Sequence, residues 1–220
     1  GFYNSLRRNQ NVSYGGLIKN SDTTILTFSP ELFFRKQQDD IYVRPMKGTM
    51  QRGRTNDEDR KLADFLHNDI KNRSENVMIV DLLRNDLGRL SRMGGVEVQS
   101  LFDVEKYETL FQMTSSIRGE LDRSVSLEQM FSALFPCGSV TGAPKIRTME
   151  IIRELEAEDR NVYTGAIGFM SPACEAVFNV PIRTVVLKGG RGEMGIGSGI
   201  VWDSDPVGEW EECRLKGRFL

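Results

Sequence analysis

The middle of the chain reads Ser74-Glu75-Asn76-Val77-Met78-Ile79-Val80-Asp81-Leu82-Leu83-Arg84-Asn85-Asp86-Leu87-Gly88-Arg89. Its apolar run, Val77 to Leu82, fits either a buried strand or the continuation of a helix, because hydrophobic periodicity does not separate the two in so short a run. The polar residues from Arg84 to Arg89 follow at once. They can line the edge of a cleft, or end a helix that Gly88 caps, and both interpretations can hold together. The elements predicted on each side of this stretch therefore decide the fold class.

Strand patterns dominate the chain before this stretch. The segments Val12 to Ile18 and Thr23 to Phe28 are predicted strands, with a turn at residues 20–22 between them, and together they form a β-hairpin. A third strand is predicted over Ile41 to Arg44, and it ends at Pro45.

Amphipathic helices are predicted from capping signals. Thr55 and Glu58 form a possible capping box that opens a helix, and Ser126 with Gln129 offers a second one. Pro144 suits the first position of a third helix, which runs to about residue 156. The apolar face predicted for the first helix consists of Leu62, Phe65, Leu66 and Ile70.

Further strands and a last helix complete the pattern. The predicted strands or strand-rich segments are 96–101, 111–117, 162–170, 176–188 and 193–202. A short final helix is predicted over Glu209 to Arg218. This mixture of long strands and amphipathic helices, without internal repeats, predicts an α+β fold.

Composition excludes several classes of protein. The chain has 220 residues and a formal net charge of −2, which does not favour nucleic-acid binding, because that usually needs a basic face. No run of 18 or more apolar residues is present, so no membrane partner is predicted. The three cysteines are far apart and indicate reduced thiols in a cytoplasmic protein. With one histidine, a bound metal must rely on carboxylates, which favours Mg²⁺ over zinc.

Two side chains near predicted strand ends could carry chemistry. Lys47 lies between a strand end and a Gly-Thr turn, and its amine becomes a nucleophile only if it is neutral. Glu31 follows a proline and becomes a general acid if burial raises its pKa. The commoner alternative for each is a solvated side chain, since lysine and glutamate are mostly exposed.

The C-terminal part offers two further candidate binding features. Glu209 and Glu212 are three residues apart on the predicted helix, so their carboxylates share one face and repel unless a cation or water lies between them. Trp210 is expected to anchor this helix to the core. The glycine-rich segment 196–200 and the loop 135–145 both present backbone N–H groups that can hold an anion, although a tight turn explains the first equally well.

The order of these short motifs along the chain resembles that of one family. The motifs are 29–31, 45–49, 80–89, 138–145, 181–184, 197–201 and 209–212. Together they resemble the chorismate-binding enzymes, which include anthranilate synthase large subunits, aminodeoxychorismate synthases, isochorismate synthases and salicylate synthases. The resemblance runs from about Asn9 to the end of the chain. It implies an anthranilate synthase component I-like fold, a two-layer α/β sandwich of mixed β-sheets with helices on the outside.

The resemblance also implies how the chain is organised and how it binds its ligands. Residues 1–220 are expected to form the C-terminal portion of one chorismate-binding catalytic domain, with the N-terminal part of the family domain absent. Glu75 and Glu212 resemble the Mg²⁺ ligands, and Glu209 adjoins them. The implied substrate-binding residues are Gly48, Thr49, Thr141, Tyr163, Ile182, Arg183, Gly197, Ser198, Gly199 and Lys216.

Lys47 points to one branch of the family. Anthranilate and isochorismate-type enzymes usually carry alanine at this position, whereas Pro-x-Lys-Gly-Thr is similar to the aminodeoxychorismate synthases. The implied reaction is the Mg²⁺-dependent amination of chorismate to 4-amino-4-deoxychorismate, in folate biosynthesis, with Lys47 as nucleophile and Glu31 as general acid. The implied partners are chorismate and a glutamine amidotransferase that supplies ammonia. Anthranilate or isochorismate chemistry and a non-catalytic truncated homologue remain as alternatives.

Overall fold

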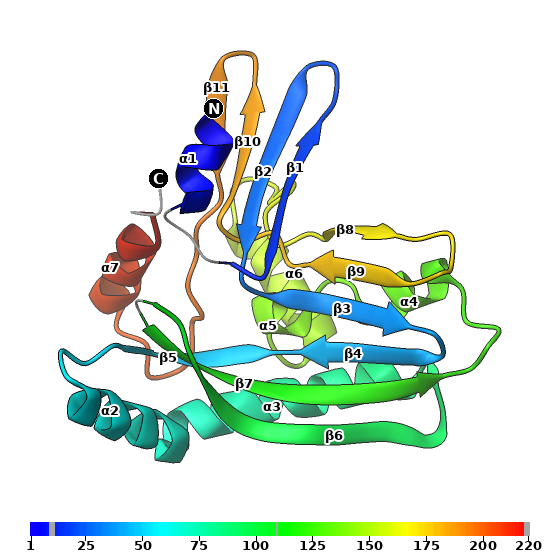
Figure 1. The fold of residues 1–220 in the computed structure, drawn as a ribbon, viewed down its shortest axis with the longest axis horizontal. Coiled ribbons are helices and arrows are strands. Elements are labelled where there is room, and N and C mark those ends of the chain that lie inside the picture. The colour runs from blue at the N-terminus through cyan, green and yellow to red at the C-terminus, as the bar shows by residue number, and fades with distance from the viewer. Residues whose placement is uncertain (9–11, 109, 218–220) are drawn as a thin grey trace. The chain divides into compact units, whose positions relative to one another are not determined.

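The computed structural model describes residues 1–8, 12–108 and 110–217, and the chain divides into two compact units (Figure 1). The smaller unit combines residues 1–31, 159–167 and 179–220, and the larger unit combines residues 32–158 and 168–178. Both units contain helices and antiparallel strands, so the predicted α+β class is confirmed.

The smaller unit contains a sheet of four strands in the order β1-β2-β10-β11. Figure 1 shows its two hairpins, in blue and orange, side by side. The predicted hairpin is confirmed, with its turn at residues 20–22. The elements of this unit are α1 (Phe2–Arg8), β1 (Tyr14–Lys19), β2 (Thr23–Ser29), β10 (Thr184–Lys188), β11 (Arg191–Met194) and α7 (Pro206–Gly217).

A small apolar core supports this sheet. Leu26 and Phe28 of β2 are buried together with Leu6 of α1 and Val185 of β10. Tyr3 stacks on the Phe28 ring at 5.0 Å between ring centroids. The apolar side chains of the hairpin strands therefore bind helix α1 to the sheet.

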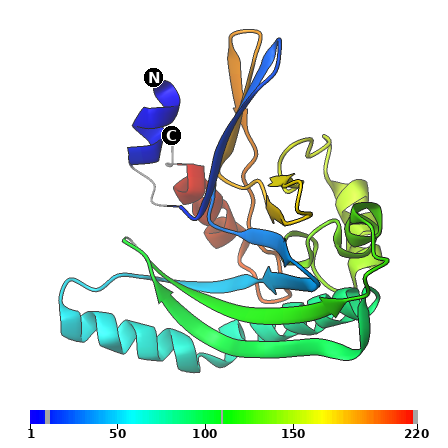
Figure 2. The ribbon, with the colours of Figure 1, turned by 45° about the vertical axis from the view of Figure 1, so that its right-hand side comes forward.

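The larger unit is built on a sheet of seven strands, in which β5-β7-β4-β3-β9-β8 are neighbours and β6 pairs with β7. Figure 2 shows helices α2 and α3, in cyan, along one face of β5, β6 and β7. The strands are β3 (Leu32–Gln37), β4 (Asp40–Arg44), β5 (Met46–Gln51), β6 (Ser91–Lys106), β7 (Leu110–Leu121), β8 (Ile167–Met170) and β9 (Ala176–Asn179). The helices are α2 (Asn56–Asn68), α3 (Ile70–Gly88), α4 (Leu127–Leu134), α5 (Gly138–Thr141) and α6 (Lys145–Leu155).

The apolar run 77–82, which fitted either a strand or a helix, is helical. Residues 77–82 lie inside α3, where Ile79, Val80, Leu83 and Leu87 are buried. The prediction that Gly88 caps this helix is wrong, because Gly88 is its last helical residue and Arg89 is the C-cap. The alternative of a buried strand is likewise excluded for these residues.

The capping predictions are largely confirmed. The Ser126 and Gln129 box is complete, with the backbone N–H of each residue donating to the side chain of the other. The Thr55 hydroxyl accepts from the Glu58 N–H, but the Glu58 carboxylate accepts from Arg54 N–H at 2.7 Å rather than from Thr55. Pro144 is the N-cap of α6, so the helix begins at Lys145, one position after the predicted start.

Several apolar positions lie where the helical pattern did not place them. Leu66 is fully buried, yet Phe65 is exposed, and Ile70 is 81% exposed at the start of α3. Trp210 is 66% exposed, so the prediction that it anchors α7 to the core is wrong.

Within the predicted strand segment 193–202, only residues up to Met194 form a strand. The predicted end of the last helix, Arg218, lies outside the described residues.

Candidate active site

The Gly-Thr turn that was predicted after Lys47 is instead part of strand β5, in which Lys47 and Gly48 form a β-bulge. Strand β5 pairs with β7 so that Met46 faces Thr114 and Thr49 faces Gln112. Two residues, Lys47 and Gly48, therefore occupy the space opposite one residue of β7. A bulge of this kind leaves an extra residue unpaired and changes the direction of a side chain. It places the half-buried Lys47 at a point where the ladder is interrupted.

Gly48 is required by both the backbone and the space around it. Its φ of +84° is in the left-handed region, which glycine adopts without strain. A Cβ at this position would lie 2.9 Å from Oδ1 of Asn72 in helix α3. The carboxylate of Asp69 accepts from Asn72 Nδ2 at 2.8 Å and from Asn72 N at 2.9 Å. Asn72 is thus held against the bulge by its own helix cap.

Gln112 is a site residue that the sequence analysis missed. Its carboxamide lies at hydrogen-bond distance from Gly48 O and from Thr49 Oγ1. No local motif marks a single glutamine in a strand. The signal is the register of β5 against β7, and that register follows only from the folded sheet.

Glu75 projects from α3 at a point where the helix is fixed to the sheet. The next residue, Asn76, is fully buried and accepts from Ser115 Oγ at 2.5 Å. Ser115 Oγ in turn accepts from the Phe102 N–H at 3.1 Å. This chain of hydrogen bonds ties α3 to β6 and β7, so the half-buried Glu75 starts from a rigid backbone.

Among the polar residues of the 84–89 segment, which one interpretation placed at a cleft edge, Asp86 forms a buried ion pair and the others are exposed. Asp86 is buried, and burial raises its pKa, while Lys145 opposes that rise. The Lys145 Nζ donates to Asp86 Oδ2 at 2.5 Å and to Leu134 O at 3.0 Å. This ion pair joins α3 to the start of α6. Thr141, from the same loop region, donates its hydroxyl to Cys137 O at 3.1 Å.

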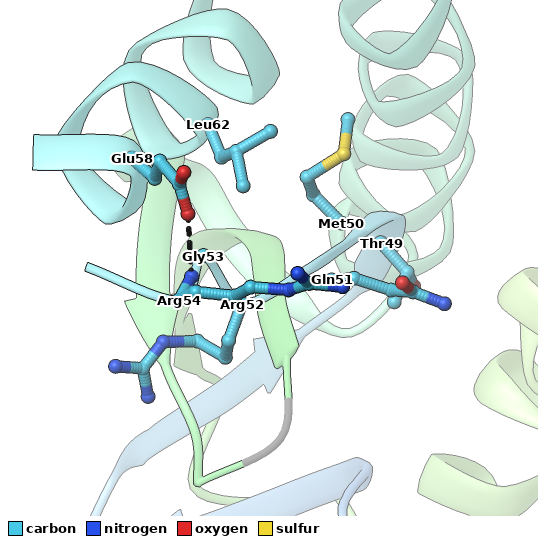
Figure 3. Close-up of a pocket in the computed structure, with 8 residues that line it drawn as sticks. All are labelled: Thr49, Met50, Gln51, Arg52, Gly53, Arg54, Glu58 and Leu62. Atoms are coloured by element: carbon cyan, nitrogen blue, oxygen red, sulfur yellow. Dashed lines mark hydrogen bonds between the residues drawn. The ribbon is translucent and has the colours of Figure 1, made fainter. Parts of the chain in front are cut away.

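An open pocket of about 450 Å³ extends from Thr49 along the end of β5 to helix α2 (Figure 3). Arg52 from this segment donates to Tyr107 O at 2.7 Å and forms an ion pair with Asp59. The hydrogen bond from Arg52 holds the pKa of Asp59 below its usual range, with Lys106 contributing. These contacts fix the segment that follows the candidate site.

Glu31, in the smaller unit, is 5% exposed. The alternative of a solvated glutamate side chain is therefore wrong. Its N–H donates to Ser29 Oγ at 3.1 Å, and Ser29 Oγ donates to Val180 O at 2.6 Å. Its carbonyl accepts from Val180 N at 3.1 Å. The segment 29–31 is therefore fixed on both sides of a buried carboxyl group.

The substrate-binding residues predicted in the C-terminal part gather partly in the smaller unit. A Cβ on Gly197 would lie 2.8 Å from the hydroxyl oxygen of Tyr163, so these two residues are in contact. Lys216 Nζ donates to Gly197 O at 3.0 Å and pairs with Glu212 at 2.7 Å. Arg183 adopts a φ of +49°, which is uncommon for a side-chain-bearing residue and is concentrated at functional sites. Ile182 precedes it, and its N–H donates to Val180 O at 2.7 Å.

The acidic residues of α7 offer oxygen ligands of the kind that Mg²⁺ prefers. Glu209 Oε1 accepts from Ser204 Oγ at 2.6 Å, while Glu212 pairs with Lys216 four residues later. Glu75 belongs to the larger unit. Within either unit, no three Asp, Glu, His or Cys side chains of the described residues are grouped closely enough to hold a metal by themselves.

The three cysteines, all among the described residues, form no disulfide bond. None of the described helices is long and apolar enough to cross a membrane.

Comparisons with known proteins agree on one family. The model of the chorismate binding enzyme family matches residues 1–220. The chain is 43% identical over 214 residues to aminodeoxychorismate synthase component 1 of Bacillus subtilis (strain 168), covering 97% of this chain and 46% of that protein. It is 40% identical over 218 residues to an anthranilate synthase component 1 of Haloarcula marismortui, covering 99% of this chain and 45% of that protein.

A solved structure is similar as well. The crystal structure of anthranilate synthase component I from Streptococcus pneumoniae TIGR4 superimposes with a TM-score of 0.91 at 35% identity, covering 99% of this chain and 48% of that one. The chain thus spans under half the length of each of these three relatives.

Proposed function

We propose, since this chain belongs to the chorismate-binding enzyme family, that the protein aminates chorismate with ammonia to give 4-amino-4-deoxychorismate. The aminodeoxychorismate synthase and anthranilate synthase relatives are about equally similar, so overall identity does not choose between their reactions. The choice depends on the residue at position 47.

Lys47 is the observation that carries the proposal. A lysine in the Pro-x-Lys-Gly-Thr motif is similar to the aminodeoxychorismate synthases, whereas the other branches usually carry alanine. The bulge supports this role, because an unpaired, half-buried residue next to Gly48 is free of the regular alternation of the strand.

The proposed reaction proceeds in two displacements. The neutral Lys47 amine forms a bond to C2 of chorismate, the ring double bonds shift, and the 4-hydroxyl leaves as water with a proton from Glu31. Ammonia then forms a bond to C4, the double bonds shift back, and the bond between C2 and the lysine nitrogen breaks, which returns Lys47 as the neutral amine. The nitrogen added at C4 gives up one proton, which restores Glu31. One ammonia enters and one water leaves. The burial of Glu31 supports its role, because an acid in a low-dielectric setting keeps its proton more readily.

We propose Glu75, Glu209 and Glu212 as the residues that would hold Mg²⁺. Their chemistry fits this ion, since all three supply only carboxylate oxygens. When bound, Mg²⁺ would supply positive charge for the ring carboxylate of chorismate. Lys216 now balances the charge of Glu212, so it would have to release that carboxylate and become available to the substrate.

A second protein would supply the ammonia. The relatives named above are designated component 1 or component I of their synthases. We propose that a glutamine amidotransferase acts as the other component here, and that free ammonia replaces it in the test tube.

The test uses the full-length protein with chorismate, Mg²⁺ and excess ammonia, and the product is identified by chromatography. We expect 4-amino-4-deoxychorismate, and we expect Lys47→Ala to abolish its formation. Lys61→Ala, which changes an exposed lysine on α2, is the matched control and should leave turnover unchanged. Formation of anthranilate, or near-normal turnover by Lys47→Ala, would contradict the proposal.

A further inference from the structure

We propose that Gln112 is a positioning residue, whose carboxamide fixes the bulge after Lys47 and makes the Thr49 hydroxyl a pure hydrogen-bond acceptor toward the substrate. The inference rests on the proposed function for the role of Lys47. Its geometry depends only on contacts within the larger unit.

The orientation of the Gln112 side chain is determined by its partners. Gln112 Nε2 donates to Gly48 O at 2.9 Å, and a carbonyl oxygen only accepts. The amide nitrogen must therefore face Gly48, and the amide oxygen must face the other partner. That partner is Thr49 Oγ1, at 3.0 Å from Gln112 Oε1.

This orientation determines whether the Thr49 hydroxyl donates or accepts hydrogen bonds. An amide oxygen cannot donate, so the Thr49 hydroxyl uses its only hydrogen in the bond to Gln112. The exposed Thr49 oxygen then offers lone pairs alone to any ligand. It can accept from a hydroxyl or from the N–H of ammonia, but it repels a carboxylate. The structure thus assigns to this position the part of the substrate that donates hydrogen bonds.

The same carboxamide closes the bulge opposite helix α3. Asn72, on helix α3, limits the space beside Gly48, and Gln112, on the neighbouring strand, donates a hydrogen bond to the Gly48 carbonyl. The backbone immediately after Lys47 is therefore held from two sides. A nucleophile gains from such restraint because the barrier rises steeply when a reacting atom is misplaced.

A double-mutant cycle on Gln112→Met and Thr49→Val tests the inference. Methionine keeps the length of the side chain but removes both hydrogen bonds, and valine removes the hydroxyl. We measure kcat and KM for chorismate consumption with saturating ammonia, whatever the product. If Thr49 acts through its bond to Gln112, each single variant lowers kcat by roughly tenfold, and the double variant is no slower than the slower single one. Gln37→Met, an exposed glutamine at the end of β3, is the matched control and should behave as the unsubstituted protein.

A purely structural role would lower the fraction of folded protein but leave kcat per folded molecule unchanged, and an unchanged kcat would overturn the inference. Losses in kcat that multiply in the double variant would also overturn it, because two residues that act through one shared bond are not additive. If no chorismate is consumed, the proposed function fails, and the same cycle is measured on chorismate affinity by calorimetry. Normal turnover by Lys47→Ala would likewise overturn only the proposed function.

Gln112→Glu provides an independent readout. A carboxylate still accepts from Thr49 but faces the Gly48 carbonyl without a hydrogen to donate, whereas the protonated acid can donate. The ratio of the Gln112→Glu rate to the unsubstituted rate should rise as pH falls toward the ordinary glutamate pKa of about 4.3. A ratio that is constant with pH would contradict the assigned orientation.

Discussion

Gly48 and Asn72 approach each other so closely that a single added carbon on Gly48 would lie 2.9 Å from the Asn72 side chain. The contact joins the bulge of β5 to helix α3, which also carries Glu75. Because Asp69 holds Asn72 in place, the bulge cannot widen without disturbing the helix cap.

Gly48→Ala should destabilise the protein. The substitution forces alanine into a left-handed conformation and presses its methyl group against Asn72, so we expect a loss of about 2 kcal/mol or more. Urea unfolding of the full-length protein measures it. Gly88→Ala is the control: no neighbour lies within 4 Å of the added carbon, and the helical position should gain up to about 1 kcal/mol. Equal stability of the Gly48→Ala variant would contradict the contact.

Lys145→Met should be among the most damaging changes outside the candidate site. It leaves the buried Asp86 carboxylate without its cation, and breaking a buried pair typically costs about 3 kcal/mol or more. Adding Asp86→Asn should restore part of the stability, because the uncompensated charge disappears. Denaturant titration of both variants checks this, and simple addition of the two losses would contradict it.

Asp86 also predicts a pH dependence. Burial raises the pKa of Asp86 in the folded protein, so the folded state tolerates the neutral acid better than the carboxylate. The contribution of this group to the free energy of unfolding is therefore fully present below its unfolded-state pKa, and it is lost as pH rises through its folded-state pKa. The loss of unfolding free energy caused by Lys145→Met should therefore become smaller at acid pH. We would measure the difference in unfolding free energy between this variant and the unsubstituted protein from pH 7 down to pH 4. A difference that does not change with pH would exclude Asp86 as its source.

Asp59 predicts the opposite pH dependence. Its pKa is lowered chiefly by the hydrogen bond from Arg52, so the stability it contributes is present above the unfolded value of about 3.9 and is lost as pH falls below it. Asp59→Asn should destabilise the protein at pH 7 and reduce its sensitivity to acid. Thermal unfolding at several pH values measures both effects. Asp57→Asn, an exposed position on the same helix, is the control and should change neither.

Glu212→Gln should raise the Mg²⁺ concentration needed for half-maximal turnover. An amide has no charge for the ion, and the proposed set would lose one of its three carboxylates. Chelation by EDTA should abolish turnover of the unsubstituted protein, and added Mg²⁺ should restore it. Glu211→Gln, its neighbour on α7, tests whether any carboxylate on this helix has the same effect. Identical Mg²⁺ titrations for Glu212→Gln and the unsubstituted protein would remove Glu212 from the proposed site.

The elements with strong local signals could be predicted from the sequence. The hairpin around residues 20–22 and the helix after Ser126 follow from turn residues and a capping box, both of which act within a few residues. The run 77–82 could not be assigned, because its helical state depends on packing against strands that are distant in sequence. Strands β3 and β5 were missed for a similar reason, since each is defined by its partner strands.

The candidate site shows the same division. Lys47, Gly48 and Thr49 were found through their motif, but the expected turn is a bulge whose register only β7 defines. Gln112 carries no local signal, and the burial of Glu31 reverses the expectation for an isolated glutamate. The roles of Glu75, Glu209 and Glu212 in metal binding stay a prediction.

The bulge at Lys47 means that the side chain at position 47 takes no part in the regular pairing of β5 with β7. Met46 and Thr49 keep the pairing with Thr114 and Gln112 on either side of the irregularity, and Met113 fills the interior opposite it. A change of the amino acid at position 47 therefore leaves the strand pairing on either side in place. If Lys47 sets the reaction as we propose, one codon is enough to change the chemistry while the sheet keeps its register.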